Sequence, residues 1–490
     1  ESSVAVTIDT LSNTHYHLDL DADSVASHLT MEQRNAVLAS VQSKLSIIVG
    51  GPGTGKTSII VELLRVVDAL GIPPERMVLA APTSKAAYRM GESVSLALQR
   101  HQAPNKTALQ ERLPSPMTLH RLLDYRPWSG QFGRHRQSPI AADLVIIDEA
   151  SMVDLELFLH ILDGLAPSTR LVLLGDPGQL PSVGNGAVLR DLVSAGSVKV
   201  SRLTKSFRMN ESDPAGSQIY QASRQILETP NDIGALPTYA MDWSTWTKNP
   251  PKGIHCTELA AADYPLFVRL WYERFYADEV WSDLNKRWSW DRDEKPNELP
   301  DIETVFERFQ TARILSPTRV GPQGTTRLNE HFAHNIRTAI GGPTLGGFGA
   351  GDLVICNRND YRLELFNGDQ GVVIKNQSAS GESALWVVFE GGAELRLYPL
   401  HMVTQLLEHA FALTVHKSQG SEFDTIALSL PMQSTMTISK PLVYTAVTRA
   451  KREVLVLGST YQLMIASQTP LERFTTLESR LAEAAQTEVA

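Results

Sequence analysis

Short apolar runs alternate with segments of helical periodicity along much of the chain, and polar residues or glycine follow most of the runs. Continuous aliphatic runs, typical of strands buried on both faces, occur at 46–49, 77–81, 144–147 and 171–174. Apolar residues at helical spacing follow the first run, from Ile59 to Val67. This alternation predicts an α/β fold.

The second half of the chain repeats this pattern around a different kind of segment. Strand-like runs recur at 313–315, 425–428 and 454–457, and residues 327–340 have a helical pattern. Between them, residues 341–405 are rich in glycine, carry further strand-like runs and contain the hairpin signal Asn367-Gly368. This part of the sequence predicts a small inserted β-barrel.

Length and composition limit the classes to which the chain can belong. With 490 residues it is too long for one core, and its hydrophobic (42%) and charged (20%) fractions are typical of a soluble globular protein. No apolar run approaches the roughly 18 residues of a membrane helix. The only cysteines, Cys256 and Cys356, form no metal or disulfide pattern, so we expect a cytoplasmic protein. The net charge of −9 means that nucleic acid would need a local basic surface.

A glycine-rich loop lies between the first predicted strand and its helix. Such a loop lets backbone N–H groups approach phosphate oxygens, and the helix N-terminus adds positive potential. The lysine would contact the β- and γ-phosphates of ATP, and the final threonine would bind Mg²⁺. The loop consists of Gly50, Gly51, Pro52, Gly53, Thr54, Gly55, Lys56 and Thr57.

Polar residues follow two of the later buried strands. Asp148 and Glu149 end the run at 144–147, where paired carboxylates are costly without a cation. Asp148 is predicted to hold Mg²⁺, and Glu149 to polarise the attacking water. Gln179 follows the next strand and is a candidate sensor of the γ-phosphate, although Asp176-Pro177-Gly178 also indicates a plain turn.

Several further segments allow a structural and a functional interpretation. Gln33 can complete a capping box with Thr30, bind the edge of adenine, or do both. Pro82 and Thr83 end a strand where ligands bind in α/β folds, but Thr83 can also simply cap a helix. Residues 99–139 mix basic and aromatic side chains, which suits single-stranded nucleic acid or a solvated loop.

Two features near the middle and end of the chain also leave alternatives open. Six of the eight tryptophans lie between residues 228 and 310, either in a core or at a partner interface. Arg449 lies in a predicted helix of small residues, from which its side chain would extend towards a γ-phosphate, or it is a surface arginine.

Taken together, the motifs resemble those of superfamily-one helicases, in the same order and over residues 30–460. Finer features are similar to the RecD subunits of RecBCD-type exodeoxyribonuclease V: 321–324 with 328–330, 365–371 and 443–450. The helicase motifs are the Gln33 segment, the glycine-rich loop 50–57 (the P-loop), 80–83, 148–151, 175–179, Arg208, 414–422 and Arg449.

The resemblance implies two RecA-like lobes with ATP between them and single-stranded DNA across both, moving 5′ to 3′. It implies that Gln33 contacts adenine, that Arg208 and Arg449 contact the γ-phosphate, and that Glu422 contacts the ribose. It also implies partners of the RecB and RecC type, duplex DNA ends as substrates for recombinational repair, and nuclease activity in a partner. The residues that it places near DNA are Pro82, Thr83, His120, Thr414 and His416.

The resemblance also suggests domain boundaries. RecD subunits have an N-terminal helical domain that docks on RecC, but only about thirty residues precede the helicase motifs here, so either that domain is missing from this chain or the docking differs. A solitary RecD-like helicase without partners is the alternative within the family, and a P-loop ATP switch that does not move along DNA is the alternative outside it. The predicted segments are 1–29 (remnant or linker), 30–205 (first lobe), 206–340 (second lobe with an aromatic insertion), 341–405 (inserted barrel) and 406–490 (remainder of the second lobe).

Overall fold

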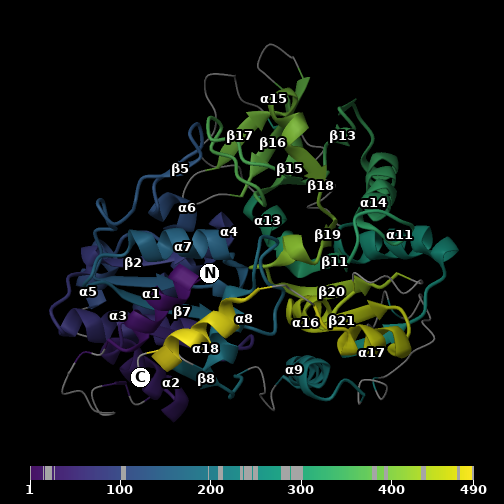
Figure 1. The fold of residues 1–490 in the computed structure, drawn as a ribbon. Helices are drawn as coiled ribbons and strands as arrows, with labels where there is room; N and C mark the ends of the chain where they lie inside the picture. Colours follow the sequence, from purple (N-terminus) through teal and green to yellow (C-terminus); the bar gives the residue numbers. More distant parts are fainter. Residues whose placement is uncertain are drawn as a thin grey trace. The chain divides into compact units, whose positions relative to one another are not determined.

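The chain forms two compact α/β units (Figure 1), one comprising Glu1–Arg208 with Leu471–Ala490 and the other Met209–Pro470. No helix in the described residues is long and apolar enough to cross a membrane. The computed structural model describes residues 2–14, 16, 25–26, 28–100, 106–196, 198–207, 213–231, 236, 246, 252–277, 287–288, 302–377, 383–390, 395–431, 438–471 and 475–487.

A parallel sheet forms the centre of the first unit. Its strand order is β3-β2-β6-β7-β1-β8. Successive side chains point to opposite faces, so Ile47 and Val49 lie in one buried cluster and Ile48 in the other. The strands are β1 (Leu45–Gly50), β2 (Met77–Ala81), β3 (Met117–Thr118), β6 (Leu144–Ile147), β7 (Arg170–Gly175) and β8 (Val200–Leu203).

Helices cover both faces of this sheet, as expected for buried parallel strands. One face packs against α2 (Met31–Gln42), α3 (Lys56–Ala69) and α4 (Ser84–Arg100), with α5 (Lys106–Arg112) beside them. The other packs against α1 (Ser2–Ser12), α6 (Leu119–Leu122), α7 (Leu155–Gly164), α8 (Val188–Ala195) and α18 (Leu477–Thr487). The short hairpin β4 (Tyr125–Arg126) and β5 (Gln131–Phe132) completes the unit.

The two ends of the chain correct the predicted segment boundaries. Residues 2–12 are not a remnant or linker, because α1 buries Val4, Ile8 and Leu11 in the core of the first unit. The predicted second lobe extends to residue 490, but residues 471–490 belong to the first unit, where α18 packs beside α1 and α8. Both helices have apolar residues at helical spacing, and only tertiary packing decides which core receives them.

The second unit contains another parallel sheet, in the order β19-β11-β20-β21-β9. Its strands are β9 (Gly253–Thr257), β11 (Ala312–Ser316), β19 (Ala412–Thr414), β20 (Phe423–Ser429) and β21 (Ala450–Leu457). Its longer helices are α9 (Pro214–Glu228), α11 (Tyr264–Phe275), α13 (Ile302–Thr311), α14 (Thr325–Ile340), α16 (Lys440–Thr448) and α17 (Thr460–Gln468).

An antiparallel sheet is inserted between β11 and β19, in the glycine-rich region. Its order is β17-β16-β15-β14-β18, and β10 (Arg287–Trp288) pairs with β15. No pairing among the described strands joins β17 to β18, so the structure shows an open sheet and closure into a barrel stays a prediction. The strands of this sheet are β14 (Leu353–Cys356), β15 (Gln370–Gln377), β16 (Ser383–Phe389), β17 (Arg396–Pro399) and β18 (Leu407–His409), with α15 (Leu400–Val403) between the last two. Before them, β12 (Thr344–Leu345) and β13 (Phe348–Gly349) form a separate two-stranded sheet.

Two polar side chains connect this inserted sheet to the parallel sheet of the second unit. The Asn329 amide donates to the carbonyl oxygens of His409 (2.9 Å) and Ala412 (3.0 Å), and its oxygen accepts from the Ala412 N–H (2.8 Å). The fully buried Arg313 donates to the carbonyl of Ala410. Side-chain hydrogen bonds therefore fix the backbone at His409, Ala410 and Ala412, between the end of β18 and the start of β19.

Two tryptophans of the second unit support the core interpretation. Trp246 and Trp271 are buried, with ring centroids 5.9 Å apart, and the Trp246 indole donates to Glu453 (3.3 Å). Trp243, Trp281 and Trp290, on which the interface interpretation also depends, lie outside the described residues.

Candidate nucleotide site and nucleic-acid surface

The candidate nucleotide residues lie at one edge of the first sheet. The P-loop follows β1, Asp148 follows β6 and Gln179 lies in the loop after β7, and these three strands are neighbours in the sheet. All the strands are parallel, so their carboxyl ends form a common edge, which is where open α/β sheets bind ligands.

The P-loop conformation depends on residues without side chains. Gly53 and Gly55 have positive φ angles of 74° and 80°, which most residues avoid. A Cβ at Gly55 would lie 2.4 Å from the Gln33 side-chain nitrogen. The loop opens directly into α3, whose first residue is Lys56. Its N-terminal N–H groups therefore face the loop, as anion binding requires.

Lys56 and Asp148 interact electrostatically across this edge. The Lys56 ammonium donates to the carbonyl oxygens of Gly50 (2.7 Å) and Gly51 (3.2 Å). Loss of solvation raises the pKa of the half-buried Asp148 carboxyl, and the positive charge of Lys56 opposes this. A cation near Asp148 would favour its charged form in the same way.

Glu149 adopts a strained backbone conformation beside Asp148. Its φ is 53°, in the left-handed region, and its N–H donates to the Asp148 carboxylate at 2.8 Å. Such conformations cost about 1 kcal/mol or more, and they cluster at functional sites.

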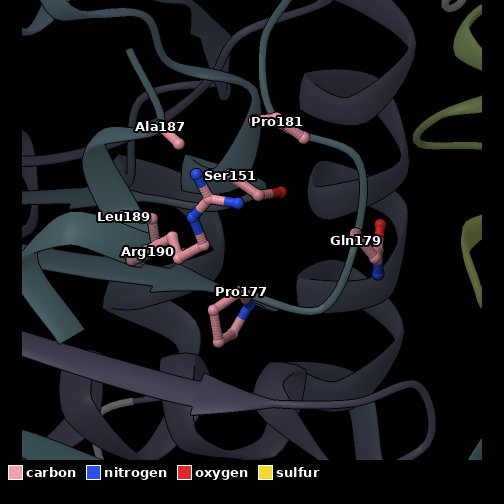
Figure 2. Close-up of a pocket in the computed structure, with 7 residues that line it drawn as sticks. All are labelled: Ser151, Pro177, Gln179, Pro181, Ala187, Leu189 and Arg190. Carbon is pink, nitrogen blue, oxygen red and sulfur yellow. The ribbon is translucent and has the colours of Figure 1, made fainter. Parts of the chain in front are cut away.

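Gln179 borders a small pocket on the same side of the unit. Its amide donates to Asp176 at 3.3 Å, and the turn that the sequence indicated is present, with Gly178 N–H bonded to Asp176. Figure 2 shows Gln179 on the loop that carries Pro177 and Pro181, with Arg190 of α8 across the pocket. Ser151, which follows the Asp148–Glu149 turn, lines the same pocket.

Gln33 forms the predicted capping box and also contacts the P-loop. Its side chain accepts from Thr30 N–H (3.0 Å), its backbone N–H donates to the Thr30 hydroxyl (3.3 Å), and its amide donates to the Thr54 carbonyl (3.1 Å). It is only 2% exposed. The capping box is confirmed, and the contact with adenine stays a prediction.

Phe207 is a further candidate site residue, and no motif in the sequence marks it. Its N–H donates to the Gly53 carbonyl at 2.8 Å, yet 52% of the residue is exposed. Its ring lies 3.2 Å from the position of a Cβ at Gly55. The sequence feature that could have indicated this residue is its large apolar side chain in the otherwise polar segment after β8. The neighbouring Arg208, predicted to contact the γ-phosphate, lies outside the described residues.

Pro82, Thr83 and His120 follow β2 and β3 at the same edge of the sheet. The Thr83 hydroxyl accepts from the Ala86 N–H at 3.2 Å, so its capping role is confirmed. His120 packs against Tyr125 with ring centroids 5.2 Å apart, and loss of solvation lowers its pKa, which favours the neutral imidazole. Trp128, between β4 and β5, is 85% exposed.

In the second unit the candidates lie at two different edges. Thr414 ends β19, and its hydroxyl accepts from Lys417 N–H at 3.3 Å, beside His416. Glu422 and Arg449 instead directly precede β20 and β21. Residues 414–422 therefore extend from the carboxyl edge of the sheet to its amino edge.

Arg449 does not extend away from its helix as the sequence analysis predicted. It is 4% exposed, and its guanidinium donates to the carbonyl oxygens of Thr445 (3.3 Å) and Ser421 (3.2 Å). Glu422, next to Ser421, pairs with Lys451 at 3.7 Å. The structure thus brings Arg449 and Glu422 together within the second unit.

Comparisons with known proteins identify the family. The AAA domain model matches residues 33–185, and the UvrD-like helicase C-terminal domain model matches residues 409–457. The RecBCD enzyme subunit RecD of Mycolicibacterium smegmatis is 32% identical over 458 residues, covering 92% of this chain and 74% of that protein. This chain belongs to the RecD family of DNA helicases.

Further similar proteins include another RecD subunit and a helicase of a different name. RecD of Haemophilus influenzae is 29% identical, covering 86% of the chain and 68% of that protein. The ATP-dependent RecD2 DNA helicase of Deinococcus radiodurans is 30% identical, covering 92% and 52%. Pif1 helicase from Bacteroides, solved with ADP-AlF3 and single-stranded DNA, is 16% identical, covers 94% of this chain and 98% of that one, and has a TM-score of 0.43.

The predicted family and α/β fold are therefore confirmed, whereas the role of each site residue stays a prediction.

Proposed function

We propose that this RecD-family chain couples ATP hydrolysis to 5′-to-3′ movement along single-stranded DNA, as the helicase subunit of a RecBCD-type complex that processes duplex ends for recombinational repair. The main support is the convergence of the P-loop, Asp148-Glu149 and Gln179 at the ends of adjacent strands. The direction of movement rests on the family resemblance.

The P-loop residues 50–57 would bind the nucleotide phosphates through backbone N–H groups and Lys56. Thr57 and Asp148 would hold Mg²⁺, which supplies positive charge to the phosphates. Few protein ligands are needed, because Mg²⁺ retains waters and binds phosphate oxygens directly.

Hydrolysis would depend on residues that respond to the γ-phosphate. Glu149 would accept the proton of the attacking water, and Gln179 would contact the γ-phosphate. Arg208 and Arg449 would stabilise the charge that develops during phosphoryl transfer. Arg449 would first exchange its bonds to the Thr445 and Ser421 carbonyls for charge-assisted bonds to phosphate.

The nucleoside would lie beside the outer face of the P-loop. Gln33 still has an N–H to offer adenine, because an amide nitrogen has two and one is bonded to Thr54. Phe207 presents an exposed ring near Gly55 against which a base can stack. Glu422 would bind the ribose hydroxyls.

DNA would cross the carboxyl edges of both sheets. Pro82, Thr83 and His120 would contact it from the first unit, and Thr414 and His416 from the second. The exposed Trp128, near Arg126 on the β4–β5 hairpin, offers a stacking surface for a base.

RecB- and RecC-type subunits are the proposed partners, with nuclease activity in one of them and the complex acting in the bacterial cytoplasm. A solitary RecD-like helicase is the alternative, and an ATP-dependent RecD2 DNA helicase is among the similar proteins. The burial of Trp246 and Trp271 within the second unit removes part of the case for an aromatic partner surface.

The deciding experiment is ATP turnover with and without single-stranded DNA, followed by displacement of a strand from duplexes with either a 5′ or a 3′ overhang. Strong stimulation by DNA, with displacement only from the 5′ overhang, would support the proposal. A P-loop switch would show little stimulation by DNA, and displacement from the 3′ overhang would contradict the direction.

A further inference from the structure

Three charged side chains meet at the carboxyl edge of the second sheet, beside Thr414 and His416. The Glu408 carboxylate accepts from the Arg319 guanidinium at 2.8 Å and from the Lys417 ammonium at 2.9 Å. Asn357 also donates to it at 3.4 Å. The cations come from positions almost a hundred residues apart, so only the fold creates this cluster.

The strand order explains why they meet. Arg319 lies in the loop after β11 and Lys417 in the turn after β19, and these strands are parallel neighbours with Ser316 opposite Thr414. β19 and β20 lie on opposite sides of β11. The loops after these strands therefore diverge to either side of β11 at the carboxyl edge of the sheet. Ligands of open α/β sheets bind at such points.

The cluster is charged and accessible. Burial alone raises the pKa of Glu408, but Lys417 and Arg319 bring it below its ordinary value, so the carboxylate is ionised at neutral pH. The Arg319 side chain is 66% exposed and that of Lys417 28%. Both can therefore meet another anion without unfolding the site.

We propose that Arg319 and Lys417 bind the phosphates of the DNA strand, and that Glu408 is a built-in competitor which occupies these cations until DNA displaces it. This proposal rests on the proposed function, because it needs a strand at this edge. The carboxylate lowers affinity for anions generally, and a strand of several phosphates competes better than an isolated phosphate, because its other contacts hold it there.

A competitor and a structural tie predict opposite effects of Glu408→Gln. Glutamine retains the shape and can still accept hydrogen bonds, but it does not attract cations. If Glu408 competes with DNA, the variant binds single strands more tightly, by about 3- to 10-fold, the range expected for two partly exposed ion pairs. If Glu408 only positions the cations, binding weakens.

The experiment measures the affinity of full-length protein for fluorescein-labelled oligothymidine across a range of salt concentrations, together with the DNA concentration that half-saturates ATP turnover. We expect Glu408→Gln to lower the dissociation constant for the oligothymidine and the half-saturating DNA concentration by the same factor. Adding Arg319→Gln and Lys417→Gln should abolish the gain. These two changes should also reduce the salt slope by about 0.7 for each phosphate that the protein no longer binds.

Glu330→Gln is the matched control, because it removes the same charge from an exposed ion pair with Arg327 on α14. It corrects for the overall charge and should leave the affinity unchanged. Unchanged or weaker binding by Glu408→Gln, or an equal gain in Glu330→Gln, would overturn the inference while leaving the proposed function intact. A parent protein that neither binds the oligothymidine nor responds to it would overturn both.

Discussion

The two units distribute their candidate residues differently. In the first unit, the P-loop, Asp148, Gln179 and the candidate DNA residue Thr83 all follow strands at one edge of the sheet. In the second unit, Thr414 follows a strand, whereas Arg449 precedes one. Nucleotide and DNA candidates are thus neighbours in one unit and lie at opposite edges in the other.

This difference suggests how each unit would transmit the state of the nucleotide. In the first unit, loops at the same edge can respond directly to a phosphate. In the second, residues 414–422 connect the two edges, and the Ser421 carbonyl accepts from Arg449. If Arg449 moves towards a γ-phosphate, that hydrogen bond breaks. Residues 414–422 can then change conformation, and Thr414 and His416 move with them.

The largest expected effect tests the first unit. Lys56→Ala should reduce DNA-stimulated ATP turnover by more than about 10³-fold, because the ammonium stabilises phosphate charge. The fold should survive, since Lys56 bonds only to carbonyls of its own loop. Steady-state turnover and thermal melting measure the two effects. The control is Lys199→Ala, an exposed lysine of the same unit, and normal turnover in a folded Lys56 variant would refute the phosphate site.

Arg449→Ala tests whether the second unit acts on the same nucleotide. Turnover should fall by about 10³-fold, as for other arginine fingers, while ATP and DNA still bind. A fluorophore on each unit should report closure with an ATP analogue but not with ADP in the parent, and no closure in the variant. Arg452→Ala, an exposed arginine nearby, is the control. Closure of the variant like the parent would transfer the coupling role to Arg208.

Glu149→Gln tests whether Glu149 acts in hydrolysis and its neighbour Asp148 in binding Mg²⁺. We expect nucleotide affinity to be retained and hydrolysis to fall by about 10²-fold or more, because the amide cannot accept a proton. Nucleotide titration and single-turnover hydrolysis separate the two quantities. Glu156→Gln, on the exposed first turn of α7, should change neither. A variant with poor affinity and high residual turnover would make Glu149 a structural residue.

Asn329→Ala has the smallest expected effect and tests the connection between the inserted sheet and the parallel sheet of the second unit. Removal of its three hydrogen bonds leaves buried backbone groups at His409 and Ala412 unsatisfied, which should destabilise the protein by about 2–4 kcal/mol. Chemical denaturation measures this. Thr338→Ala, on the exposed part of α14, should cost much less, and equal destabilisation would argue against a special role for Asn329.

Local patterns determined much of the fold and most of the nucleotide-site candidates. The strand before the P-loop, the strand ending at Asp148 and the capping box of Gln33 each depend on a few consecutive residues, whose propensities and spacing are visible in the sequence. The helicase resemblance rested on the same local blocks, and the family comparison confirmed it.

Tertiary structure alone decided what depends on long-range packing. The apolar residues of α1 and α18 predict helices, but the sequence does not specify that both pack on the first unit. The direction of Arg449 depends on the carbonyls of Ser421 and Thr445, and the cluster of Arg319, Glu408 and Lys417 depends on which strands are neighbours. Local propensity specifies what a segment becomes, whereas strand order and the burial of apolar faces decide which distant side chains meet.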